Sequence, residues 1–225
     1  MSAALPGQDA PRAWPMYRAM VGVGLFCALS IVTVFQLTRP IIARNRAEAL
    51  EQAIFQVLPE ARSSAAFGLV DGERFERIEG EAKGELVYAG FDEAGALVGL
   101  ALEARGMGYQ DVVHILYGYD PAGQAVIGFR VLESRETPGL GDRIERDDDF
   151  LANFTRLDVS VSADGGGIAH PIEAVKHGEK QHPWQVDGIT GATISSVAIA
   201  DMLRASTVRR LPTVRAHLDD FRRPE

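Results

Sequence analysis

Two threonines and two glycines lie in the short stretch Asp187-Gly-Ile-Thr-Gly-Ala-Thr193. The residues that follow predict a helix, because their apolar side chains recur at helical spacing: Ile194, Val197, Ala198 and Met202. A helix start offers unpaired backbone N–H groups and the positive end of the dipole, so it attracts phosphate. Gly191 has no Cβ to keep a ligand from the backbone, and Thr193 places a hydroxyl where a phosphate would lie. The stretch indicates an anion site; an ordinary glycine turn that caps a helix is the alternative.

A second stretch with unusual residue types is Glu136-Thr-Pro-Gly-Leu-Gly-Asp142. Pro138 fixes φ and the two glycines permit positive φ, so the sequence predicts a shaped loop at the end of a strand. Further upstream, Gly108 and Tyr109 lie in a glycine-containing segment between two predicted hairpins. An aromatic side chain there suits contact with a planar ring. A connecting loop whose tyrosine packs on the sheet is the alternative for this segment.

Both stretches resemble segments of one known family. The first matches D-G-x-[ST]-G-A-T, the signature at which a flavin transferase attaches FMN through a phosphoester to the last threonine. The second is similar to an E-T-P-G-L-G-D segment of the same proteins. The chain therefore resembles, over nearly its whole length, the FMN-binding domain proteins. These include the G subunit of the Rnf electron-transport complex and the C subunit of the sodium-pumping NADH:quinone oxidoreductase.

The resemblance implies a role for particular residues. Thr193 would carry FMN covalently, and Asp187 and Gly188 would belong to the signal that the transferase recognises. Other residues would contact the cofactor: Thr190, Gly191, Ala192, Ser195, Glu136, Thr137, Gly139, Leu140, Gly108 and Tyr109. Glu136 and Thr137 would hydrogen-bond the flavin ring or ribityl chain. No side chain is expected to be catalytic, because the isoalloxazine carries the redox chemistry.

The chain departs from the family pattern directly after the motif. Ile194-Ser195-Ser196 stands where a further threonine, and often a basic residue, is commoner. Ser195 can still cap the helix, so we expect attachment to survive this departure.

Composition excludes several other classes of protein. The chain has 225 residues, enough for one domain and an appendage. Its 23 Lys and Arg against 31 Asp and Glu argue against a nucleic-acid-binding protein. Cys27 is the sole cysteine, so no internal disulfide can form. His170, His177 and His182 have no common metal-ligand spacing, and we expect no metal site.

An uncharged apolar run, Ala19–Leu37, has nearly the length needed to cross a bilayer as a helix. A signal peptide is the alternative, but no small-residue cleavage pattern follows, which favours an uncleaved anchor. Arginines on both sides leave the orientation open. The resemblance implies a single-pass protein of the bacterial inner membrane with its soluble domain in the periplasm. A separate helix is expected over Pro40–Leu58, with the proline at its start.

An internal repeat organises the middle of the chain. Tyr88–Arg105 and Tyr117–Arg135 each contain a predicted strand, an Asp-x-Ala-Gly turn and a second predicted strand. The spacing differs between the two copies after the turn, which predicts a bulge or a register change. Two hairpins predict an antiparallel sheet, and with helices at both ends of the domain the fold class is α+β.

The expected organisation is a flexible cytoplasmic N-terminus (1–18), a transmembrane anchor (19–38), a linking helix (39–59), a periplasmic FMN-binding domain (60–206) and a C-terminal tail (207–225). We interpret the tail as a short surface helix interrupted by Pro212.

The resemblance implies an electron carrier in an ion-translocating ferredoxin:NAD oxidoreductase, an enzyme only as part of that complex. Its expected partners are the other subunits, the flavin transferase and the membrane. Three alternatives stay open: a component like the C subunit of the quinone reductase, a stand-alone flavodomain reductase, and a cofactor-free, membrane-tethered interaction domain.

Overall fold

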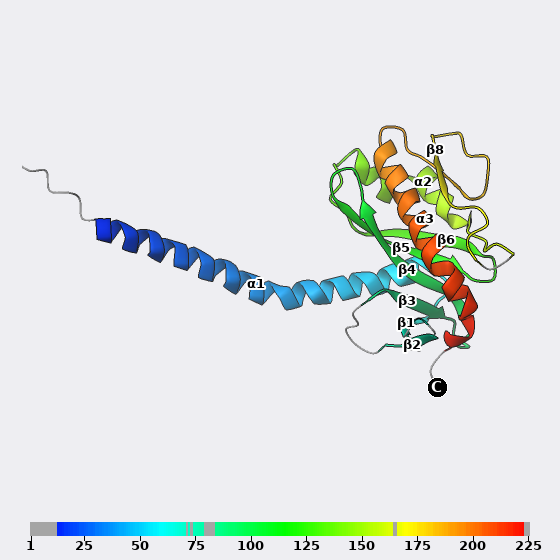
Figure 1. Cartoon of the computed structure of the whole chain (residues 1–225), viewed down its shortest axis with the longest axis horizontal. Coiled ribbons are helices and arrows are strands. Elements are labelled where there is room, and N and C mark those ends of the chain that lie inside the picture. The colour runs from blue at the N-terminus through cyan, green and yellow to red at the C-terminus, as the bar shows by residue number, and fades with distance from the viewer. Residues whose placement is uncertain (1–12, 71, 73, 79–83, 164–165, 223–225) are drawn as a thin grey trace, which may run out of the picture. The chain divides into compact units, whose positions relative to one another are not determined.

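The computed structural model describes residues 13–70, 72, 74–78, 84–163 and 166–222 (Figure 1). The chain divides into two units, Met1–Glu48 and Ala49–Glu225. The helices and strands are α1 (Ala13–Val57), β1 (Ser63–Val70), β2 (Arg74–Arg77), β3 (Leu86–Phe91), β4 (Leu97–Met107), β5 (Val112–Asp120), β6 (Ala125–Glu133), the 3-10 helix η1 (Gly141–Glu145), α2 (Asp148–Ala152), η2 (Asn153–Thr155), β7 (Leu157–Asp158), β8 (Glu173–Val175), β9 (Gln185–Asp187), α3 (Thr193–Ala216) and η3 (Leu218–Asp220).

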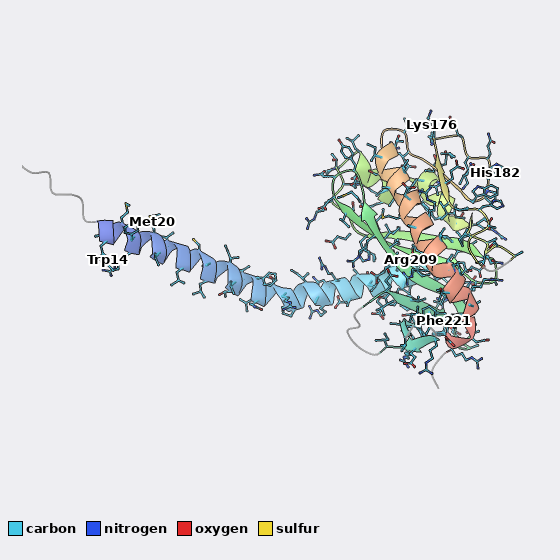
Figure 2. All side chains as sticks on the ribbon, viewed as in Figure 1. Trp14, Met20, Lys176, His182, Arg209 and Phe221 are labelled. Atoms are coloured by element: carbon cyan, nitrogen blue, oxygen red, sulfur yellow. The ribbon has the colours of Figure 1, made fainter. Side chains whose placement is uncertain are left out.

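The first unit consists, in its described part, of residues 13–48 of helix α1. Its apolar side chains are exposed and point away from the helix, as Trp14 and Met20 do in Figure 2. Among the described residues α1 is the one helix long and apolar enough to cross a membrane, a test that a signal sequence also passes. The prediction of a separate helix beginning at Pro40 was wrong. One continuous helix contains this proline, which removes a single backbone hydrogen bond while its fixed φ stays helical.

The second unit is built on a seven-stranded sheet in the order β2-β1-β3-β4-β5-β6-β7. All neighbouring strands in it are antiparallel. The two predicted hairpins are β3–β4 and β5–β6, and register shifts occur within both, near Gly90 and near Gly118. A separate parallel pair, β8–β9, leads to α3. The predicted α+β class with an antiparallel sheet is confirmed.

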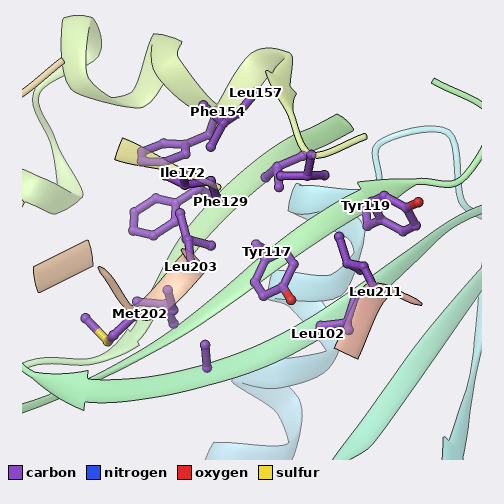
Figure 3. Close-up of a cluster of buried hydrophobic side chains, with 14 of the residues drawn as sticks. Leu102, Tyr117, Tyr119, Phe129, Phe154, Leu157, Ile172, Met202, Leu203 and Leu211 are labelled. Carbon is purple, nitrogen blue, oxygen red and sulfur yellow. The ribbon is translucent and has the colours of Figure 1, made fainter. Parts of the chain in front are cut away.

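Side chains along each strand alternate between the two faces of the sheet, so the core consists of two clusters, one against α3 and one against the end of α1. Leu100 and Leu102 of β4 belong to the larger cluster, which includes the buried face of α3. Ala101, between them, belongs to a smaller cluster with the last turns of α1. Figure 3 shows part of the larger cluster, where Leu203 of α3 lies near Tyr117 of β5. The sheet is therefore the middle layer of this unit, and its position relative to α3 fixes the start of that helix.

Four glycines allow the end of α1 to approach the sheet closely. Gly90 pairs with Gly99 and Gly118 pairs with Gly128 across neighbouring strands. A Cβ added to Gly128 would lie 2.5 Å from the carbonyl oxygen and 2.6 Å from the Cα of Val57, and one on Gly118 would meet the same carbonyl. A Cβ added to Gly90 or to Gly99 would lie 2.8 or 2.7 Å, respectively, from a δ-carbon of Leu58. We call these four residues the glycine track.

Helix α3 is longer than predicted. It continues through Pro212 to Ala216, and Leu211, Val214 and Phe221 are buried. Burying large apolar side chains stabilises by about 1.5–3 kcal/mol each, which offsets the roughly 3 kcal/mol cost of an internal proline. The expectation of an interrupted surface helix after Thr207 was therefore wrong.

Candidate functional site

The Asp187–Thr193 stretch forms the turn between β9 and α3, at the orange end of α3 in Figure 1. Thr193 is the first residue of α3, and its N-cap Ala192 makes no side-chain capping bond. Among the described residues, the amides of Thr193, Ile194 and Ser195 have no hydrogen-bond acceptor. The predicted helix start is therefore present, with donors available to an anion.

The outer side of this turn is open. Thr190, Gly191 and Thr193 are exposed, whereas Ala192 is buried. Gly191 has a φ of +87°, and an added Cβ would meet no described atom within 4 Å. A glycine adopts this left-handed conformation without strain and leaves the backbone accessible. The turn thus presents the hydroxyl-bearing side chains of Thr190 and Thr193 on an exposed surface at the start of α3.

Three side chains from different segments hold the turn in place. The Ser196 hydroxyl donates to the Ala192 carbonyl at 2.9 Å and accepts from the Ile189 amide at 3.1 Å. The buried Asn153 amide accepts from the Asp187 N–H and donates to the Asp187 carbonyl, both at 3.0 Å.

The Arg143 guanidinium completes this set, because it donates to the Thr190 carbonyl at 2.8 Å. It places a cation beside the exposed turn. Sequence reasoning missed Arg143, Asn153 and Ser196, although Arg143 directly follows the second motif and a basic residue beside a predicted anion site is a usable signal.

Asp187 and Gly188 have structural contacts of their own. Both carboxylate oxygens of Asp187 accept from the Gly178 amide, at 2.8 and 3.0 Å, and the His177 ring lies 3.8 Å away. A Cβ on Gly188 would lie 3.0 Å from the Val175 carbonyl oxygen. These contacts attach the motif to β8 and to the loop that follows it.

The second motif loop meets the start of α3 through Glu136. This side chain is buried, with 6% of its surface exposed. One carboxylate oxygen accepts from the backbone N–H of Gln110 at 2.9 Å, and the other accepts from the Ser195 hydroxyl at 2.5 Å. The structure therefore brings together the three segments that the sequence singled out: Gly108-Tyr109, the loop from Glu136, and the motif helix.

The remaining predicted residues surround this junction. The Thr137 hydroxyl donates to the Gln110 side chain at 3.0 Å, and Gly139 has a φ of +80°. Tyr109, Leu140 and Ile194 are 63, 53 and 59% exposed, respectively. Exposed side chains of these types suit contact with a planar aromatic group.

Asp147 supports the turn indirectly, and its removal is expected to have a pH-dependent cost. It caps α2 by accepting from the Phe150 amide at 3.1 Å, and it pairs with Arg143 at 2.6 Å. Burial raises the pKa of Asp147, but the hydrogen bond from the Phe150 backbone N–H and the charge of Arg143 together lower it by more than burial raises it. The pKa therefore lies below its ordinary value of 3.8. Its stabilising contribution is therefore present above that value and is lost as the pH falls through the folded-state pKa.

We expect Asp147→Ala to lower the free energy of unfolding by about 1–2 kcal/mol at pH 7, with the deficit shrinking below about pH 4. Thermal unfolding at several pH values measures it. Asp148→Ala is the matched control, because Asp148 is exposed in the same turn. A deficit of equal size at pH 7 and pH 3 would contradict the assignment.

Comparison with known proteins identifies the family of this chain. The FMN-binding domain family matches residues 108–207, which include both motif stretches. The G subunit of the ion-translocating oxidoreductase complex of Methanosarcina acetivorans is 30% identical over 190 residues, which cover 83% of this chain and 88% of that protein. The chain belongs to the family of these G subunits. The resemblance that the two motifs indicated is confirmed.

A further relative supports this assignment, and a solved structure shares the fold. The G subunit of the ion-translocating oxidoreductase complex of Cereibacter sphaeroides is 32% identical over 164 residues, covering 68% of this chain and 70% of that protein. The crystal structure of the C subunit of the Na⁺-translocating NADH-quinone reductase from Parabacteroides distasonis has a TM-score of 0.56 at 19% identity. It covers 76% of this chain and 92% of that chain. This likeness shows the shared fold alone.

Proposed function

We propose that this chain is an electron-transfer subunit of an ion-translocating oxidoreductase complex, and that it carries FMN through a phosphoester to Thr193. One observation carries the proposal. An exposed threonine begins a helix whose first three amides have no acceptor in the described part of the chain, and it lies within the region that matches the FMN-binding domain family. The relatives are named as G subunits of such a complex, which supports the assignment to a complex.

The residues of the site fit an FMN group. The amides of the first turn of α3 and its dipole stabilise a phosphate charge, and Arg143 adds a cation beside Thr190. Tyr109, Leu140 and Ile194 offer exposed apolar surface for an isoalloxazine. FMN, when bound, supplies a carrier of one or two electrons. The protein orients it and sets its electrostatic surroundings.

Attachment requires a separate flavin transferase that uses FAD and a divalent metal. Thr193 Oγ forms a bond to the phosphorus of the FMN half of FAD. The bond between the two phosphates breaks, AMP leaves, and the threonine proton passes to a base. No electrons move in this step. Asp187 and Gly188 are proposed to belong to the surface that the transferase recognises.

The apolar part of α1 is proposed to anchor the protein in the inner membrane, with the FMN-binding domain in the periplasm. Length and composition of α1 support the anchor. Protease added to intact spheroplasts should then digest the domain. Protection of the domain until the membrane is broken would contradict the periplasmic side.

A component like the C subunit of the sodium-pumping quinone reductase is the second candidate. A solved structure of such a C subunit has the same fold. Assignment as a G subunit is preferred because the identity of 30% extends over 88% of a G subunit protein.

The test is the intact mass of the full-length protein purified from its own host. We expect a gain equal to one FMN less one water, flavin fluorescence that survives denaturing electrophoresis, and a modified peptide that contains Thr193. An unmodified mass from cells shown to contain the transferase would overturn the proposal and leave the cofactor-free tether.

A further inference from the structure

We propose that Glu136 is a positioning residue for the attachment of FMN, acting through Ser195 and making no contact with the cofactor. The inference rests on the proposed function and deepens it. It replaces the sequence-based hypothesis that Glu136 hydrogen-bonds the flavin directly.

Both carboxylate oxygens of Glu136 are used inside the protein. The backbone N–H of Gln110 donates to one at 2.9 Å, and the Ser195 hydroxyl donates to the other at 2.5 Å. Glu136 is 6% and Ser195 is 2% exposed, so water does not compete for these bonds. The bond to Ser195 joins segments 59 residues apart, and the bond to Gln110 joins segments 26 apart.

Two glycines enclose this carboxylate. A Cβ on Gly108 would lie 2.5 Å from the oxygen that Gln110 contacts. A Cβ on Gly141 would lie 2.9 Å from the Ser195 hydroxyl and would meet the second carboxylate oxygen. The two glycines therefore leave the space that the carboxylate occupies beside the first turn of α3. We call Glu136, Gln110 and Ser195 the carboxylate clamp.

The clamp determines which side of α3 carries Thr193. Successive helical residues are rotated by about 100°, so Thr193 and Ser195 lie about 200° apart around the axis. Holding Ser195 inward against Glu136 consequently turns Thr193 outward, and Thr193 is exposed in the structure. The carboxylate also lies at the positive end of the helix dipole, which stabilises it there. Loss of the clamp would let the first turn rotate or fray and would misplace the acceptor hydroxyl.

The experiment uses full-length apo protein, purified from cells without the transferase and then treated with purified transferase, FAD and its metal. Mass spectrometry follows the modification of Thr193 over time, below the unfolding temperature of every variant. We expect Glu136→Ala and Ser195→Ala to lower kcat by about tenfold or more, since misplaced reacting groups cost rates of this order. Their KM for the protein should change less. Glu145→Ala, an exposed glutamate in η1, is the matched control and should react at the wild-type rate.

Glu136→Gln keeps the size and shape of the side chain but removes its negative charge. Its amide oxygen can accept from the Gln110 amide, and its N–H can donate to the Ser195 hydroxyl, so it should restore most of the rate. Ser195→Ala removes a single hydroxyl and serves if Glu136→Ala does not fold. A wild-type rate for Ser195→Ala and Glu136→Ala would overturn the inference. So would a Glu136→Gln variant as slow as Glu136→Ala, because the negative charge would then be the essential feature.

Hydrogen exchange gives a readout that does not depend on the cofactor. Amides of residues 196–198, the first hydrogen-bonded amides of α3, should exchange faster in Ser195→Ala than in wild-type apo protein, while those of residues 203–211 should not change. Unchanged exchange at 196–198 would contradict the clamp. If wild-type protein gains no mass with active transferase, the proposed function fails, and the exchange comparison still decides whether the clamp orders the helix start.

Discussion

Thr193→Ala is expected to remove the whole FMN mass gain and all fluorescence in denaturing gels. An ester bond needs the hydroxyl, and no neighbouring residue can substitute for it in the same geometry. Ser195 and Ser196 are buried and hydrogen-bonded to Glu136 and Ala192, respectively. Thr190 is exposed but lies three residues before the start of α3.

Thr193→Ser is the matched control: it keeps an acceptor oxygen at the same position and should keep the full mass gain. Modification of Thr193→Ala would show that a different hydroxyl is the acceptor.

Gly128→Ala is expected to have the largest effect on stability. The added Cβ would lie within 2.9 Å of three backbone atoms of Val57, and backbone cannot rotate aside as a side chain can. Overpacking of this kind costs about 3 kcal/mol. For a domain of this size each kcal/mol lowers Tm by about 2–4 °C, so we expect a decrease of about 6–12 °C.

Gly167→Ala is the control for this substitution. Among the described residues nothing lies within 4 Å of its added Cβ, and its φ is not left-handed. Thermal unfolding of the two variants, followed by circular dichroism, measures the difference. Equal melting temperatures would show that α1 does not pack against the glycine track as the structure describes.

Local patterns were sufficient for much of the fold. The repeat of strand, Asp-x-Ala-Gly turn and strand predicted the hairpins β3–β4 and β5–β6, because turn chemistry and alternation are encoded over a few residues. The predictions at Pro40 and Pro212 were wrong because local preference does not decide the structure there: both prolines lie inside helices. Pro212 ends a helix by local preference, yet the burial of Leu211 and Val214 outweighs that preference.

The same distinction applies to the site. The turn at Thr190–Thr193 was predictable, since its glycine and threonines are adjacent in sequence. The contacts that position it were not, because Asn153 reaches Asp187 across 34 residues and Glu136 reaches Ser195 across 59. Such pairs depend on the order of strands in the sheet, which no short pattern encodes. The family resemblance named Glu136 without indicating that it faces inward.

The dependence of the Thr193 turn on distant contacts has a consequence for biogenesis. Asn153, Arg143 and Glu136 reach the turn from separate segments, so its shape exists only after the sheet and α3 have assembled. Under the proposed function, a transferase that reads this shape acts on the folded chain, and flavin loading becomes a mark of successful folding. A pulse-labelled chain should then acquire protease resistance first and flavin afterwards.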